Sequence, residues 1–188
     1  MYRRILISLV AIGVLTSFMG LGGLSLFTAT TDNDGNAFTT GSVDISTSPA
    51  SAFLTLSNMA PGDSVPAQLT VSNAGIPGSG TLELRYAMTT VATNTDSKNL
   101  RDTLTLEIRD EGTSCGDFDG DVLYTGTLAS GAIGNPAQGW QSGDRTLAAG
   151  ANEVLCFKVD LPSGATGPED ASTTATFTFA AEQTKNNP

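Results

Sequence analysis

The sequence predicts an all-β fold, an antiparallel β-sandwich of the jelly-roll kind preceded by a hydrophobic N-terminal helix. Three observations lead to this prediction. Apolar and polar residues alternate with a period of two in almost every segment after residue 26, as in strands that bury one face and leave the other in water. Clusters of Gly, Pro, Asn and Asp separate these segments. No segment after residue 26 carries an apolar helical face of useful length.

The first 26 residues have the layout of an export signal. Arg3 and Arg4 precede an uncharged, mostly apolar run, and small residues lie near its end. The run is also long enough to span a bilayer, so an uncleaved N-terminal anchor is the alternative. We therefore predict a signal peptide over residues 1–26, with the cut within residues 25–29, and a single β-sandwich domain over residues 27–188.

Removing the signal leaves seven basic residues against 19 acidic ones, a formal charge of −12. Such acidity repels nucleic acids and anionic lipid headgroups, which excludes both as partners. The only membrane contact that we expect is through an uncleaved signal. The predicted location is extracellular or at the cell surface.

Five strands show clear alternation and three more are weaker. The clear strands are predicted at residues 65–72, 82–89, 104–109, 155–161 and 175–181. The weaker ones are predicted at residues 38–45, 53–57 and 122–128, with one helical turn at 96–101 and a Gly-rich loop at 129–144 that carries Trp140. Eight or nine short strands with frequent turns are typical of a sandwich or jelly roll.

The two cysteines, Cys115 and Cys156, both follow the signal. A single pair in an exported chain predicts a disulfide. If Leu155 and Phe157 face the core, Cys156 lies on the opposite face of its strand. The disulfide would then hold the Gly- and Asp-rich loop around Cys115 onto the outside of the sheet.

The sequence lacks the residues of several common active sites. It contains no histidine, which excludes Ser-His-Asp and Cys-His catalysis and the H-E-x-x-H zinc site. Neither a phosphate-binding P-loop nor a dinucleotide-binding glycine motif is present. Paired carboxylates remain an option for glycoside hydrolysis, but the acidic residues lie mostly at turns or outward positions. We predict a protein that is not an enzyme, with no catalytic residue and no cofactor.

One acidic cluster suggests a metal ion. Asp117, Asp119 and Asp121 alternate in a Gly-rich loop, and calcium prefers such oxygen ligands. The spacing does not match an EF-hand, and a solvated turn explains the same residues. Calcium is therefore a candidate ligand on composition alone.

Motifs in the right order over nearly the whole chain resemble the TasA/camelysin family. The first is the Gly-Gly ending of the signal at residues 22–27, followed by the strand pattern F-x-x-G-x-V-D-I at residues 38–45. Next come Pro-Gly-Asp at residues 61–63, V-x-N-x-G at residues 71–75 and the strand at residues 82–86. The resemblance implies a secreted jelly roll released by a SipW-type signal peptidase. Relatives polymerise into fibres of the biofilm matrix, and one relative, camelysin, is catalogued as a metalloprotease.

The resemblance also implies how the copies associate, namely by donation of the N-terminal strand of one subunit to the next. The segment 27–36 is short and polar-rich, and by itself it gains little by folding back. Phe27, Ala29 and Thr31 would form one face of the donated strand, filling a groove at an open sandwich edge. We expect a homopolymer, a structural fibre or matrix subunit. The alternatives are a spacer role for this segment, a monomeric surface adhesin or binding module, and a camelysin-like protease, against which the lack of histidine counts.

Overall fold

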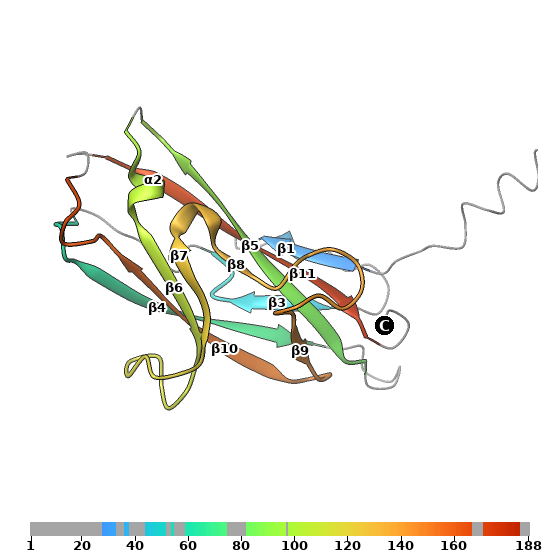
Figure 1. The fold of residues 1–188 in the computed structure, drawn as a ribbon. Coiled ribbons are helices and arrows are strands. Elements are labelled where there is room, and N and C mark those ends of the chain that lie inside the picture. The colour runs from blue at the N-terminus through green and yellow to red at the C-terminus, as the bar shows by residue number, and fades with distance from the viewer. Residues whose placement is uncertain are drawn as a thin grey trace, which may run out of the picture.

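The computed structural model describes residues 28–32, 36–37, 44–51, 54, 59–74, 82–96, 98–166 and 171–184. These residues form two antiparallel sheets whose inner faces pack together (Figure 1). The prediction of an all-β antiparallel fold is confirmed. The predicted signal at residues 1–26 lies outside the described residues, and within the described part of the chain no helix is long and apolar enough to span a bilayer.

The first sheet, called here the β5–β11 sheet, has the order β2-β1-β11-β5-β8, and β9 also pairs with β5. Its strands are β1 (Thr28–Asp32), β2 (Asn36–Ala37), β5 (Leu84–Asn94), β8 (Ala132–Ile133), β9 (Arg145–Leu147) and β11 (Thr173–Gln183). The two long strands β5 and β11 pair along their whole length, from Leu84 opposite Gln183 to Asn94 opposite Thr173.

The second sheet, the β4–β10 sheet, has the order β3-β4-β10-β6-β7. Its strands are β3 (Ile45–Ser48), β4 (Ser64–Asn73), β6 (Thr105–Asp110), β7 (Val122–Thr127) and β10 (Asn152–Asp160). A short helix α2 (Leu100–Thr103) lies between β5 and β6, and a 3-10 turn (Leu128–Ser130) lies between β7 and β8. The chain thus crosses repeatedly from one sheet to the other.

Apolar side chains from both sheets form one core between them. Phe157 of β10 meets Phe177 of β11 edge to face across the core, with ring centroids 5.3 Å apart. Tyr86 and Phe179 pack at 6.1 Å within the β5–β11 sheet. Burying these rings away from water supplies the main driving force for the fold.

All five clearly predicted strands are present, as β4, β5, β6, β10 and β11, and the strand predicted at 122–128 is β7. The strand predicted at 38–45 meets β3 only at Ile45, since β3 runs on to Ser48 and residues 38–43 lie outside the described part. The strand predicted at 53–57 also lies mostly outside it. The helical turn forms at 100–103 rather than at 96–101, because the Asp96 carboxylate instead accepts bonds from the Lys98 and Ser172 amides in a turn.

Candidate functional site

The N-terminal strand lies in the chain's own sheet. β1 pairs antiparallel with β11 through five registered positions, from Thr28 opposite Glu182 to Asp32 opposite Thr178. The register puts Ala29 opposite Ala181 and Thr31 opposite Phe179, and both of these partners are buried core residues. Phe27, the third predicted contact residue, lies outside the described residues. The edge of β11 offers a row of backbone groups, and β1 of the same copy pairs with them.

The predicted disulfide is present and braces the opposite sheet. Cys115 and Cys156 are bonded, with their Cα atoms 5.1 Å apart. Cys156 lies between the buried residues Leu155 and Phe157, as the alternation predicted. It is nevertheless fully buried, because the loop of residues 111–121 covers it from outside. The sequence predicted this attachment but not how completely the loop covers the strand.

Ionic contacts hold the same loop, called here the disulfide loop. Glu107 lies 2.6 Å from Arg109 and 3.0 Å from Lys158 on the outer face of the β4–β10 sheet. The ring of Phe118 from the loop lies 4.3 Å from the Lys158 ammonium and 5.2 Å from the Arg109 guanidinium. Arg109 also donates to the Gly120 carbonyl at 3.0 Å. Burial acts to raise the pKa of Glu107, but hydrogen bonds from the two cations outweigh it and the pKa is lowered.

The three aspartates proposed for calcium serve separate hydrogen bonds in this loop. Asp119 accepts the Thr113 amide at 2.9 Å, which lowers the pKa of its carboxyl, and Asp117 accepts the Ser114 hydroxyl at 2.7 Å. The amide of Asp121 donates to Asp110 at 2.7 Å. Among the described residues, no group of three or more acidic, cysteine or histidine side chains is arranged to hold a metal ion. Calcium binding stays a prediction from composition.

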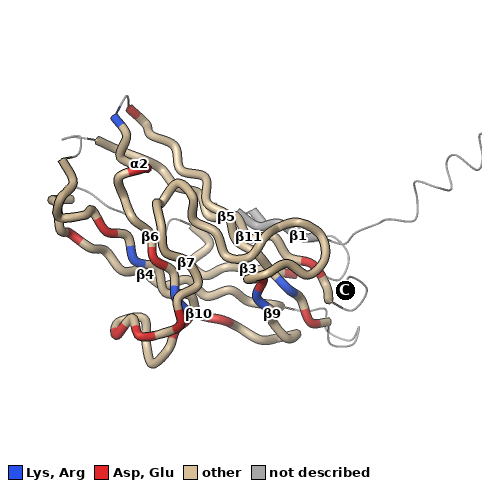
Figure 2. The backbone as a smooth tube through the Cα atoms, in the orientation of Figure 1, with Lys and Arg blue, Asp and Glu red and all other residues tan. Residues whose placement is uncertain are grey.

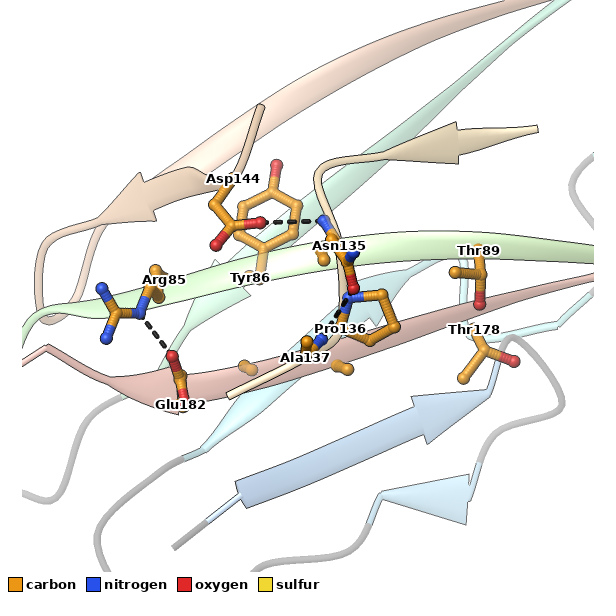
Figure 3. A pocket seen from close by; sticks show the side chains of 12 residues that line it. Arg85, Tyr86, Thr89, Asn135, Pro136, Ala137, Asp144, Thr178 and Glu182 are labelled. Carbon is orange, nitrogen blue, oxygen red and sulfur yellow. Dashed lines mark hydrogen bonds and ion pairs between the residues drawn. The ribbon is translucent and has the colours of Figure 1, made fainter. Parts of the chain in front are cut away.

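A hollow lies on the other side of the molecule, between the outer face of the β5–β11 sheet and the loop of residues 134–144, called here the roof loop. Figure 3 shows it from close by. Its volume is about 340 Å³. Residues from both strands and from the loop line it: Arg85, Tyr86, Ala87, Thr89, Asn135, Pro136, Ala137, Asp144, Thr178, Ala180, Ala181 and Glu182.

A buried ion pair closes one end of the hollow. Arg85 of β5 donates through Nε to Glu182 of β11 at 2.5 Å, and the two side chains are almost completely buried. The Gly139 amide of the roof loop donates to the same Glu182 oxygen at 3.0 Å. Asp144 shapes the loop by accepting the amides of Asn135 and Gln141, each at 2.9 Å. Arg85 lies on the outer face of β5 but is buried there, because the roof loop covers it.

A cluster of three polar residues lies beside β9. Tyr86 donates its hydroxyl to Glu153 at 2.5 Å, and Arg145 donates to the other oxygen of Glu153 at 2.9 Å. Burial and the neighbouring Glu153 charge raise the pKa of Tyr86 far above its usual value. Tyr86 therefore stays neutral and acts as a donor. This arrangement fastens β9 to the sandwich.

Camelysin is catalogued as a metalloprotease, but a zinc site of the protease kind does not fit the donor set of this chain. Histidine is absent from the sequence, and both cysteines are bonded to each other. The acidic residues of the described part form no cluster able to replace those ligands. No step through a metal ion can be derived from these residues.

Comparisons with solved structures and curated proteins add little. The infectious bursal disease virus VP2 subviral particle is 13% identical, with a TM-score of 0.28 over 86% of this chain and 34% of that one. The Gx strain of the same virus gives 13% identity and a TM-score of 0.26 over 82% and 31%. The K1 cleaved adhesin domain of Lys-gingipain from Porphyromonas gingivalis W83 gives 10% identity and a TM-score of 0.19, over 86% of this chain and 90% of that one. The chain spans about a third of the viral proteins, and no curated protein matches it.

A family model gives a firmer result. The model described as camelysin metallo-endopeptidase matches residues 1–132, more than half of the chain and including β1 to β7. The match extends over the segments whose motifs indicated the same family in the sequence. The chain belongs to the camelysin metallo-endopeptidase family.

Proposed function

We propose that this chain is a secreted structural subunit of extracellular fibres, in which β1 of one copy pairs with β11 of the next. The observation that carries the proposal is the place of β1. It is joined to the rest of its sheet by the ladder to β11, with only the two residues of β2 beyond it. A backbone ladder is indifferent to which copy supplies the strand, so β1 of a neighbour fits the same edge.

The charge distribution supports this route of association. Copies with a formal charge of −12 repel one another. The two strands that would pair carry few charges, however, since β1 contains only Asp32 and β11 only Glu182. Glu182 is already neutralised by Arg85. Strand pairing therefore avoids bringing uncompensated charge into an interface.

Family membership supports secretion. The proposed export signal at residues 1–26 would be removed by a SipW-type peptidase, which leaves β1 next to the new N-terminus. The proposed partners are thus the peptidase during export and further copies of the chain afterwards, outside the cell or at its surface.

Mixing two variants, each with one added cysteine, tests strand exchange directly. Thr30 of β1 and Ala180 of β11 are Cα partners in the ladder. When fibres are assembled from Thr30→Cys protein mixed with Ala180→Cys protein, a cross-link between them forms only if the strand of one copy pairs with another copy. We expect a disulfide-linked dimer on non-reducing gels. Thr176→Cys is the matched control, because Thr176 lies on the same strand beyond the ladder to β1.

Electron microscopy tests the fibre itself. The exported protein at high concentration should form regular filaments, and deletion of residues 27–36 should abolish them while leaving a folded monomer. Filaments that survive the deletion would exclude strand donation, and persistent monomers of the intact protein would favour a surface binding module. Casein cleavage that a chelator blocks would favour the protease that the family name describes.

A further inference from the structure

The hollow under the roof loop contains an unsatisfied hydrogen-bond donor. Arg85 uses Nε for Glu182, but its Nη2 is buried and has no hydrogen-bond partner among the described residues. A buried donor without an acceptor costs about 1–3 kcal/mol, so native structures rarely contain one. Arg85 lines the hollow, as Figure 3 shows at the end next to Glu182. The described part of the protein therefore leaves one hydrogen bond unmade at the Glu182 end of the hollow.

The charges around the hollow determine what kind of acceptor fits. Arg85 contributes one positive charge, and Glu182 and Asp144 contribute two negative ones. The lining is therefore negative by one charge, in a chain that is already acidic, and both facts disfavour an anionic ligand. A hydroxyl group suits the lining better, because it accepts from Arg85 and donates to a carboxylate at the same time.

The rest of the lining is also suited to a hydroxyl-rich molecule. Thr89 and Thr178 are cross-strand partners whose residues line the floor, next to the small side chains of Ala87 and Ala180. Asn135 lines the roof, and its side-chain amide adds donors and an acceptor. Sites for small molecules commonly combine an apolar floor with a few such polar groups, in volumes from about 300 Å³ upwards. The volume of about 340 Å³ is sufficient for one sugar ring.

An exposed aromatic residue lies on the same loop. Trp140 directly follows Gly139, whose amide is bonded to Glu182 at the end of the hollow. Its side chain is 59% exposed, one of only three large hydrophobic side chains so exposed in the described part of the chain. The C–H face of a pyranose ring is apolar and slightly positive, and it stacks on the negative face of an indole. Trp140 thus belongs to the loop that covers the hollow, one residue from the contact with Glu182.

We propose that the hollow and Trp140 together bind a neutral oligosaccharide, with one sugar unit in the hollow and a neighbouring unit against Trp140. The Arg85 Nη2 atom donates to a ring or hydroxyl oxygen of the first unit. This role does not depend on fibre formation, since the site lies within one copy. The sheet that we propose to exchange strands would in this way also hold an uncharged polysaccharide.

Calorimetric titration of the exported protein tests the proposal. The probes are cellohexaose, chitohexaose, laminarihexaose and maltohexaose, with hexagalacturonate as the anionic comparison. Trp140 is the only tryptophan, so its fluorescence reports on binding independently. We expect at least one neutral probe to bind and to shift the fluorescence, and hexagalacturonate to bind at least tenfold more weakly.

Variants then locate the binding site. Trp140→Ala should weaken binding tenfold or more, and Thr89→Val about threefold to tenfold, the value of one hydrogen bond. Thr93→Val is the matched control, because Thr93 lies on the same face of β5 outside the hollow, and it should bind as the wild type does. Near-UV circular dichroism verifies that each variant is folded. The proposal is overturned if no neutral probe binds at millimolar concentration, if hexagalacturonate binds best, or if Trp140→Ala and Thr89→Val bind like the control.

Discussion

Each sheet of the sandwich carries a loop on its outer face, and the two loops are held by different forces. The disulfide loop is bonded covalently to β10 and surrounded by charges from Glu107, Arg109 and Lys158. The roof loop covers strands whose only charged residues are Arg85 and Glu182, and hydrogen bonds connect it to that pair. Figure 2 shows the contrast, with charges gathered around β6, β10 and the disulfide loop and a long uncharged stretch along β5 and β11.

The contrast separates bracing from recognition. Over the β4–β10 sheet the loop buries Cys156 fully, and the open hollow beside it is lined mainly by acidic residues, among them Asp119 and Asp121. Over the β5–β11 sheet the cover leaves a hollow and an unsatisfied donor, Arg85 Nη2. The β5–β11 sheet is also the one that includes β1. We therefore assign both proposed interactions, with a second copy and with a saccharide, to this side of the molecule.

Breaking the Arg85–Glu182 ion pair should have the largest effect on stability, and it acts on the roof loop side of the molecule. Glu182→Ala leaves the Arg85 charge buried without a partner and removes the acceptor of the Gly139 amide. We expect the free energy of unfolding to fall by about 4 kcal/mol, the usual cost of breaking a buried pair. Urea denaturation measures it, with Glu83→Ala as the control, because Glu83 is an exposed carboxylate directly before β5. Equal losses in the two variants would show that the pair does not hold the roof loop.

Removing the disulfide should affect the opposite face. The double variant Cys115→Ala, Cys156→Ala removes the cross-link between two residues that are 41 apart in sequence. We expect the free energy of unfolding to fall by about 3 kcal/mol. Hydrogen exchange sharpens the comparison, because protection should fall in residues 111–121 and persist in residues 134–144. Glu182→Ala should give the reverse pattern. If either variant loosened both loops equally, the two covers would form one cooperative unit.

The sequence predicts the position of the disulfide loop but not that of the roof loop. Strict alternation from Leu155 to Val159 puts Cys156 on the outer face. A disulfide in an exported chain then predicts that the loop around Cys115 lies over Cys156. The same alternation puts Arg85 and Glu182 on outer positions but does not reveal that they meet, since they are 97 residues apart and depend on the register of β5 with β11. Two opposite charges in otherwise uncharged strands were the available signal. The roof loop lacks any such covalent or periodic mark.

Phe118 offers a smaller test of how the disulfide loop is held. Its ring lies beside Lys158 and Arg109, and its backbone has a φ of 53°, a conformation unfavourable for any residue but glycine. Phe118→Ala loses the ring and keeps the unfavourable backbone conformation, so we expect the free energy of unfolding to fall by about 1 kcal/mol. Phe118→Gly loses the same ring but relaxes the backbone. It should therefore be more stable than Phe118→Ala in urea denaturation, opposite to the usual order of the two residues.

The smallest expected effect is a pH dependence of the charged face. The cations lower the pKa of Glu107, so the folded state favours the carboxylate more strongly than the unfolded chain does. The stability from Glu107 is then present above the unfolded pKa of about 4.3 and is lost as the pH falls through the lower folded value. The difference in urea midpoint between wild type and Glu107→Gln should be largest near pH 7 and should shrink below about pH 4. A difference that stays constant down to pH 3 would mean that Glu107 contributes through shape and hydrogen bonding, and that charge does not distinguish the two faces energetically.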